Sequence, residues 1–88
     1  MEQINEIRIS GHVASLPFAF REKDNTTCRF PLAVMQEDTA VFYGVIYSPD
    51  TIGLQPDDLK KGDEVIVFGS LIVNEKSVRI LASEILYT

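Results

Sequence analysis

Five segments of the chain place alternate residues on two faces, the last of them less cleanly, and this period of two limits the fold more than any other feature. The segments span residues 4–13, 27–36, 40–47, 63–73 and 77–87. Such a period is typical of β-strands that bury one face. The third segment is apolar on both faces, so its period alone does not show which face points inward. The pattern predicts an all-β domain.

Between the third and fourth segments the chain changes character. Pro56 suits the first position of a short helix, the acidic Asp57 and Asp58 suit its positive end, and Lys60 and Lys61 suit its negative end. The order of three strands, a short helix and two strands is that of the OB-fold, a five-stranded Greek-key barrel. We therefore predict one such domain over residues 1–88. A small β-sandwich is the alternative, but it gives the helix no role.

Three local features refine this expectation. Gly11 lies in the middle of the first strand, where a barrel strand bends or bulges. Residues 14–26 are predicted as a loop with its tip near Asp24-Asn25, and Phe18 and Phe20 lead into that tip. Pro31, in the second strand, indicates an edge position or a bulge because proline cannot donate a ladder hydrogen bond.

Composition restricts the function classes. The chain has 88 residues and a formal net charge of −5, which argues against strong non-specific binding to a polyanion. One basic face can still lie on an acidic protein. The single cysteine, Cys28, cannot form an internal disulfide and is expected to be a small buried residue. We find no secretion signal and no apolar run long enough for a membrane span, and expect a cytoplasmic protein.

No catalytic or metal-binding constellation is evident. His12 is the only histidine, and no serine or cysteine nucleophile stands with it in a recognisable arrangement. The acidic residues fall in turns and at helix starts, and no glycine-rich phosphate loop is present. We predict that the protein is not an enzyme and that it has no metal site and no cofactor.

Several stretches resemble bacterial single-stranded DNA-binding proteins. The first strand, 5–13, followed by Pro17, resembles their opening strand, and Cys28 to Val34 resembles their second. The most specific likeness is Leu59 to Gly69, which carries lysine-glycine, two residues, alternating valines and a glycine. Within the group, the chain looks most like the shorter B-type primosomal replication proteins. It departs from the family in having no tryptophan and a short last hairpin, and we expect it to lack the family's acidic tail.

The resemblance implies single-stranded DNA binding, in which bases stack on aromatic rings and basic side chains contact phosphates. If Tyr43 and Tyr47 lie on the outer face of the third strand, they form a stacking platform with Phe68, or else a protein-binding patch. Phe18 and Phe20 are interpreted as a staple that closes one barrel end rather than as a second stacking site. The predicted phosphate contacts are Arg8, Arg29, Lys60 and Lys61.

Two functions follow from these observations. The first is an accessory single-stranded DNA-binding protein of DNA replication, with weak to moderate affinity and little sequence preference. The alternative is an interaction subunit of the primosome that docks on a polymerase, primase or helicase and binds little DNA by itself. In either case a domain this small is expected to be a homodimer or part of a hetero-complex.

Overall fold

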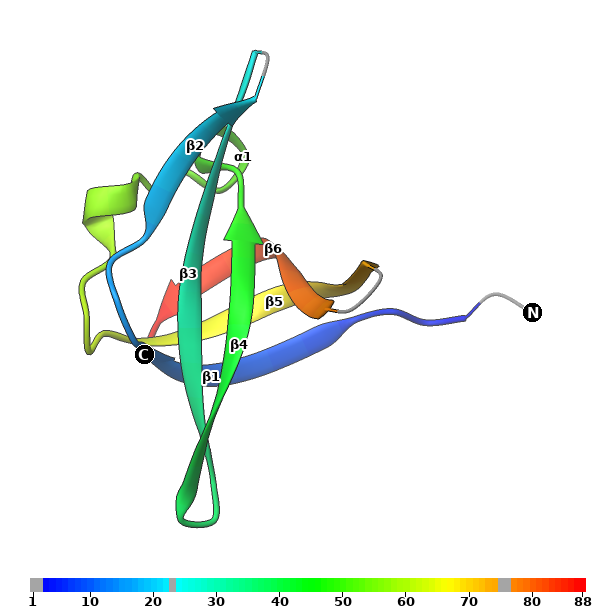
Figure 1. Cartoon of the computed structure of the whole chain (residues 1–88), viewed down its shortest axis with the longest axis vertical. Helices are drawn as coiled ribbons and strands as arrows, with labels where there is room; N and C mark the ends of the chain where they lie inside the picture. Colours follow the sequence, from blue (N-terminus) through cyan, green and yellow to red (C-terminus); the bar gives the residue numbers. More distant parts are fainter. Residues whose placement is uncertain (1–2, 23, 75–76) are drawn as a thin grey trace.

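The part of the chain that the structure describes folds into a β-barrel with one attached hairpin strand (Figure 1). The computed structural model describes residues 3–22, 24–74 and 77–88. The elements are β1 (Ile7–Val13), β2 (Phe18–Glu22), β3 (Asn25–Gln36), β4 (Thr39–Tyr47), the helix α1 (Pro49–Ile52), the 3-10 turn η1 (Pro56–Asp58), β5 (Glu64–Asn74) and β6 (Ser77–Tyr87). Neither described helical element is long and apolar enough to cross a membrane.

The barrel closes through five of these strands. Their order is β1, β5, β6, β4 and β3, and β3 then pairs with β1 at His12↔Ala33 and Val13↔Leu32. The β4–β6 pair is parallel, and the other pairs are antiparallel. α1 lies between β4 and β5 in the chain and packs against β3 and β6. The predicted five-stranded OB barrel with a short helix between its third and fourth strands is confirmed.

Two predicted boundaries are wrong. Residues 18–22, predicted as loop, form β2 and pair with the start of β3 from Phe18↔Arg29 to Glu22↔Asn25. The helix predicted over 56–61 is limited to Pro56–Asp58, and a separate helix begins at Pro49. The 3-10 turn ends because Leu59 takes an extended backbone and buries its side chain completely in the core. Lys60 and Lys61 therefore lie in the turn before β5.

The core is formed by alternate residues of the barrel strands. On the first, second and fourth predicted strands the buried face is formed by alternate residues: Val13, Cys28, Phe30, Leu32, Val65 and Val67. Their cross-strand partners on β4 and β6 share the same face. The buried apolar cluster consists of Val13, Cys28, Phe30, Leu32, Val45, Tyr47, Leu59, Val65, Val67, Ile80, Ala82 and Ile85.

Close strand approaches require glycine at two positions. A Cβ atom at Gly11 would lie 2.4 Å from the Ala33 carbonyl oxygen, where β1 passes β3. A Cβ atom at Gly69 would lie 2.0 Å from the Leu81 carbonyl oxygen, beside the register shift between Phe68 and Gly69 on β5. Both separations are shorter than any real contact, so the backbone would have to move to admit a side chain. At Gly11 the close approach of two strands, rather than backbone conformation, is what requires glycine.

Pro31 lies on β3 at the point where that strand changes neighbours from β2 to β1. Its carbonyl oxygen accepts a hydrogen bond from the Ala14 N–H at 2.9 Å. In a β-strand, the backbone nitrogen and the carbonyl oxygen of one residue point to the same side. The N–H that Pro31 lacks would therefore face the junction between β2 and β1. No hydrogen bond to β4 is lost, which explains how proline is tolerated inside the sheet.

Gly69→Ala is expected to destabilise the fold by about 2–3 kcal/mol, because the new methyl group would overlap the Leu81 carbonyl and force the β5–β6 backbone apart. At roughly 4–8 °C per kcal/mol for a domain of this size, Tm falls by more than 8 °C. The matched control is Gly44→Ala, whose Cβ would meet only Arg79 side-chain atoms at 3.6 Å or more. Thermal unfolding measures both variants, and equal Tm values would contradict the steric account.

Candidate nucleic-acid interface

The structure corrects the predicted orientation of two tyrosines. Tyr47 is 0% exposed and Tyr43 is partly buried against the core, so neither lies on the outer face of the barrel. The cause is the β3–β4 register, which pairs Tyr47 with Cys28 and Tyr43 with Leu32. Cross-strand partners share a face, and Cys28 and Leu32 point inward. The outward residues of this strand are Phe42, Gly44 and Ile46.

Tyr47 is therefore a core residue rather than a stacking platform. Its ring packs edge-on against Phe30, with centroids 6.0 Å apart. Its hydroxyl is buried and makes no hydrogen bond within the described chain, and the Cys28 thiol is its polar neighbour. Burial raises the pKa of the Tyr47 hydroxyl well above its ordinary value and also raises the pKa of the Cys28 thiol.

The outer surface of β2, β3, β4 and β6 brings together a different set of aromatic and basic side chains. One row of paired residues crosses all four strands, from Phe18 through Arg29 and Ile46 to Leu81. The rows beside it contain small or apolar residues and one more arginine. These rows are Pro31, Gly44 and Arg79; Ala33 and Phe42; and Met35 and Ala40. We call this surface the arginine–aromatic face; it also includes Phe20.

Arg29 is held in place at one end of the arginine–aromatic face. Its guanidinium carbon lies 4.3 Å from the centroid of the Phe20 ring, and the Phe18 and Phe20 centroids are 5.4 Å apart. The Arg29 Nε is buried without a hydrogen-bond partner in the described chain. Stacking of this kind fixes a guanidinium while leaving its outer N–H groups free to bind an anion.

Arg79 reaches the same region from β6. Its aliphatic stem lies over Gly44, where the absence of a side chain leaves room for it. Phe18, Arg29, Ile46 and Arg79 line a surface hollow of about 210 Å³. Phe18 and Phe42 are 57% and 63% exposed. The interpretation of Phe18 as a loop staple is therefore wrong, because it stands on the outside of a strand.

The arginine–aromatic face is electrostatically distinct. On β2, β3, β4 and β6, its paired rows from Phe18 to Met35 contain two arginines and no aspartate or glutamate. The only ion pair among the described residues, His12–Glu64, lies on β1 and β5 at the border of this face. On a chain of net charge −5, this surface is an exception to the overall charge. A local basic patch of this kind attracts phosphates regardless of the net charge.

Two other predicted site residues meet on the opposite part of the barrel. Arg8 on β1 pairs with Phe68 on β5, and Phe68 pairs in turn with Glu84 on β6. Glu6 joins Arg8 and Phe68 in lining a surface hollow of about 430 Å³. This cluster therefore mixes both signs of charge. Lys60 and Lys61 are exposed in the η1–β5 turn and belong to neither group.

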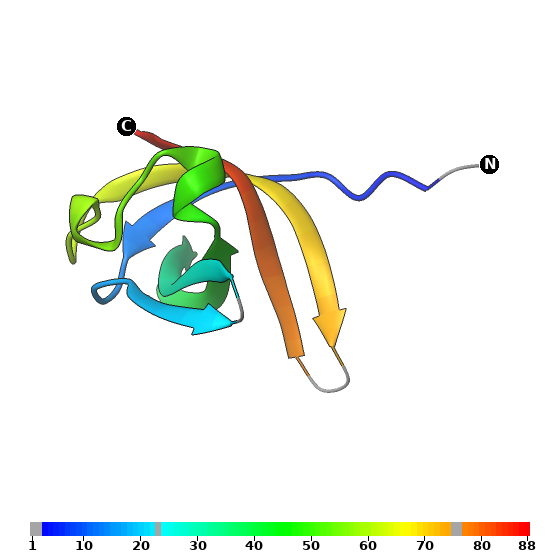
Figure 2. The same ribbon diagram turned by 90° about the horizontal axis from the view of Figure 1, so that it is seen from above.

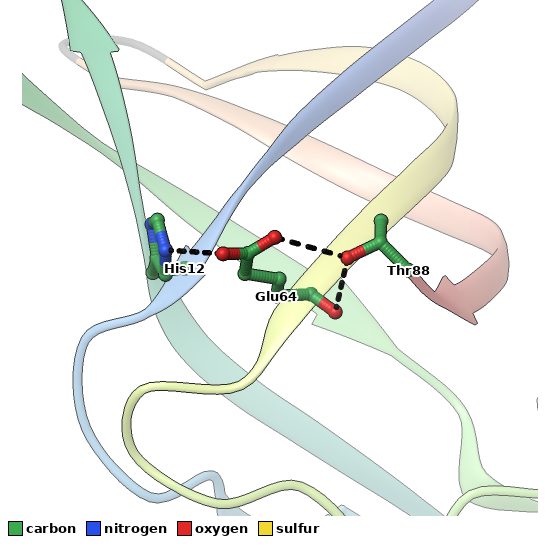
Figure 3. Close-up of polar contacts among 3 residues, drawn as sticks. All are labelled: His12, Glu64 and Thr88. Atoms are coloured by element: carbon green, nitrogen blue, oxygen red, sulfur yellow. Dashed lines mark hydrogen bonds and ion pairs between the residues drawn. The ribbon is translucent and has the colours of Figure 1, made fainter.

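His12 forms a polar contact at the edge of the barrel. Its Nε2 lies 3.3 Å from Glu64 Oε1, and the Thr88 Oγ1 lies 3.2 Å from Glu64 Oε2 (Figure 3). About half of the His12 side chain is exposed, and an exposed pair of this kind contributes less than about 1 kcal/mol. Through His12↔Ala33 and Ala33↔Phe42, this pair lies in the same row as Phe42. It marks the border of the acid-free surface.

Comparison with known proteins supports the fold assignment. Neither a family model nor a curated protein matches the chain. Among solved structures, the small single-stranded DNA-binding protein from Streptomyces coelicolor is 28% identical, with 100% of this chain and 94% of that chain covered and a TM-score of 0.82. The fold is that of bacterial single-stranded DNA-binding proteins.

Two further neighbours show the same architecture. The N-terminal domain of the PriB protein from Thermoanaerobacter tencongensis, described as dimeric, is 19% identical over 96% of both chains, with a TM-score of 0.79. The second single-stranded DNA-binding protein from Mycobacterium smegmatis is 23% identical, with 94% of this chain and 87% of that chain covered and a TM-score of 0.77. The resemblance predicted from sequence, including that to B-type primosomal proteins, is confirmed at the level of fold.

Tyr47→Phe is expected to stabilise the fold by up to about 1 kcal/mol at neutral pH, because it removes a buried hydroxyl without a partner. Because burial raises the pKa of this hydroxyl, the folded state holds the proton more tightly than the unfolded state. Stability is therefore lost as pH rises above the ordinary tyrosine pKa of about 10. Urea unfolding across this range should show a shallower loss for the variant. An identical alkaline loss would contradict the assignment.

Proposed function

We propose that the protein is a cytoplasmic accessory protein of DNA replication that binds single-stranded DNA through the arginine–aromatic face and has no catalytic activity of its own. The observation that carries this proposal is Arg29, stacked on Phe20 beside the exposed Phe18, on a surface without acidic residues in its paired rows. The likeness of the fold to single-stranded DNA-binding proteins supports it.

The chemistry of this face suits a flexible strand. Exposed rings such as Phe18 and Phe42 stack on bases, and every base offers a π-face for stacking. Arg29 and Arg79 donate charge-assisted hydrogen bonds to phosphate oxygens. Oligonucleotides bind OB-folds on the corresponding strands and neighbouring loops. The proposal replaces the two inward-facing tyrosines with Phe18 and Phe42 and keeps Arg29.

The separation of the two rings fits several nucleotides. Phe18 is aligned with Ile46, and Ile46 lies four residues from Phe42 along β4. With strand spacings of about 4.8 Å and a rise of about 3.3 Å per residue, the two positions are about 16 Å apart. A bound strand that stacks on both rings therefore crosses β3 and β4 diagonally and passes Arg29 and Arg79 on its way.

The other predicted contacts are proposed to be peripheral. Arg8 with Phe68, and Lys60 with Lys61, would meet DNA that continues beyond the arginine–aromatic face. Glu6 and Glu84 near Phe68 weaken phosphate binding there by like-charge repulsion. The main site is therefore expected on the β2–β3–β4–β6 side.

Arg29→Ala is expected to weaken binding of labelled oligo-dT about tenfold, or ~1.4 kcal/mol, because it removes a preorganised phosphate contact. Fluorescence anisotropy at several salt concentrations measures this effect. With two phosphates contacted, log Kobs should fall with log salt at a slope of about −1.4, and the variant slope should be about −0.7.

Two comparisons make this test specific. Phe18→Ala should lower affinity without changing the salt slope, because stacking releases no counterions. Arg8→Ala, which removes the same charge from the mixed-charge cluster, should have a smaller effect than Arg29→Ala. A larger loss from Arg8→Ala would move the site to the β1–β5 side, and no oligo-dT binding even at low salt would overturn the proposal.

We also propose that the protein is a homodimer. The β5–β6 hairpin extends away from the barrel (Figure 2) and presents an apolar strip on the face that continues from buried Ile80. The pairs Leu71↔Ile80 and Val73↔Val78 build this strip, and Val73 is 73% exposed. Nearby, the edge of β1 from Ile7 to Ser10 that faces away from β5 pairs with no described strand. The dimeric description of the PriB domain supports this proposal.

The alternative partner is a replication enzyme that covers the same strip. The homodimer and the enzyme complex would both bury the exposed apolar strip of the hairpin. An exposed apolar patch of this kind is typical of a protein–protein interface. The oligomeric state of the purified chain distinguishes them. A monomer would favour docking on a polymerase, primase or helicase, and binding to such enzymes would then be measured directly.

Val73→Asp is expected to convert the dimer to a monomer, because it places a charge in the middle of the apolar strip. Light scattering after gel filtration measures the mass directly. Ser77→Asp is the matched control, since Ser77 lies on the opposite face of the same hairpin and is exposed. A wild-type monomer at micromolar concentration, or equal dissociation by both variants, would overturn the dimer.

A further inference from the structure

The outward residues of β1, β5 and β6 form a surface that the proposed function leaves at the periphery. Two neighbouring rows of paired residues cross these strands: Arg8, Phe68 and Glu84, and then Ser10, Ile66 and Leu86. Phe68 and Ile66 are half-buried, and Leu86 is 44% exposed. Within the described chain, neither Phe68 nor Ile66 packs against the buried core cluster. These three apolar side chains therefore lie on the outside of the barrel, and we call them the outer floor.

Charged side chains surround the outer floor. Glu6 and Arg8 flank it on the β1 side, and Glu84 flanks it on the β6 side. None of these three forms an ion pair within the described part of the chain. Glu64, in contact with His12, adds a further carboxylate one row beyond the floor. Three carboxylates therefore stand against one guanidinium, and the rim of the floor is negative.

This combination of floor and rim favours one kind of occupant. The carboxylates repel the phosphates of a nucleic acid. A second copy packed floor to floor would bring the same negative rims together, and like charges across an interface are destabilising. An apolar centre inside a charged rim is the usual arrangement of a protein–protein interface, and a partner of complementary charge is preferred. The occupant is therefore expected to be a positively charged protein segment.

The dimensions of the outer floor fit one α-helix. The strands β1, β5 and β6 are neighbours, so the two outer strands are about 10 Å apart, which is close to the diameter of a helix. Phe68 and Ile66 are two residues apart on β5, or about 6.6 Å. Residues four apart in a helix are separated by about 6 Å along its axis. An apolar helical stripe can therefore follow β5, with its flanking positions over β1 and β6.

We propose that the outer face of β1, β5 and β6 binds a basic amphipathic helix of a protein partner. Apolar side chains of the helix pack on the outer floor, and its lysines or arginines pair with Glu6 and Glu84. This inference goes beyond the proposed function, because it assigns a second surface and does not depend on DNA binding. It also uses none of the residues of the apolar hairpin strip.

The probe is a labelled synthetic peptide of leucine and lysine, about 18 residues or five helical turns long, with its leucines on one helical face. A second peptide has the same composition in an order that gives no apolar stripe. Fluorescence anisotropy with the full chain measures both. The amphipathic peptide should bind with a Kd at least about tenfold lower than that of the second peptide.

Variants of the protein locate the contact. Glu84→Lys should weaken binding of the amphipathic peptide about tenfold, because it reverses an exposed charge on the rim. Phe68→Ala should weaken it similarly by removing part of the floor. The matched control is Asp38→Lys, which makes the same charge change at the exposed turn between β3 and β4 and should alter Kd less than about threefold. Circular dichroism checks that each variant is folded, and Glu84→Lys decides the test if Phe68→Ala is not.

Several results would overturn the inference. Equal losses from Glu84→Lys and Asp38→Lys would show only a general attraction to an acidic protein. A peptide that Val73→Asp releases and Glu84→Lys does not would bind the hairpin strip instead. A homodimer that Phe68→Ala dissociates, measured by light scattering, would assign the floor to a second copy. Failure of oligo-dT to bind would end the proposed function and leave this inference intact, since the peptide assay contains no DNA.

Discussion

Strands of the barrel approach each other very closely at two points, and each requires a residue without a side chain. β1 passes β3 at Gly11, and β5 pairs irregularly with β6 at Gly69, with carbonyl oxygens where a Cβ atom would lie. These contacts allow β1 and β5 to bend strongly enough for a five-stranded ring to close at so small a radius. Closure leaves the barrel without a free edge between β1 and β3 and completes the enclosure of the core. The remaining features of the molecule depend on this geometry.

Closure also determines the surface that we assign to nucleic acid. Because β1 meets β3 only at His12 and Val13, the first part of β3 is left for β2, and Pro31 lies at the change of neighbour. The β2 strand thereby extends the outer surface and brings Phe18 and Phe20 beside Arg29. Residues far apart in the sequence meet there, since Arg79 arrives from the last strand through its parallel pairing with β4. The site is thus a consequence of strand order rather than of any local motif.

The sequence predicts the fold well because alternation, turn residues and the two glycines all agree, and β6 begins and ends where predicted. It fails on one strand face, for a physical reason. A turn of Glu37-Asp38-Thr39 would pair Gln36 with Ala40, whereas the actual turn of Glu37-Asp38 pairs Gln36 with Thr39. A shift of one residue moves every side chain of β4 to the other face. Since β4 is apolar on both faces, only its register with β3 places Tyr47 in the core. The strand β2 was also missed, although the alternation of Phe18 and Phe20 indicates a strand there.

The acidic composition is compatible with the proposed DNA binding if base stacking contributes more of the binding free energy than phosphate contacts do. Two arginines release few counterions, so most of the binding free energy must come from stacking on exposed rings, at about 1–3 kcal/mol per base. One barrel with two exposed rings is therefore expected to bind weakly. In the proposed dimer, joined through the apolar strip of the β5–β6 hairpin, a DNA strand long enough to reach both copies would meet a second arginine–aromatic face. The second contact is then intramolecular, and avidity raises the affinity without any additional charge. On this account the exposed apolar hairpin and the acid-free face are two parts of one binding device.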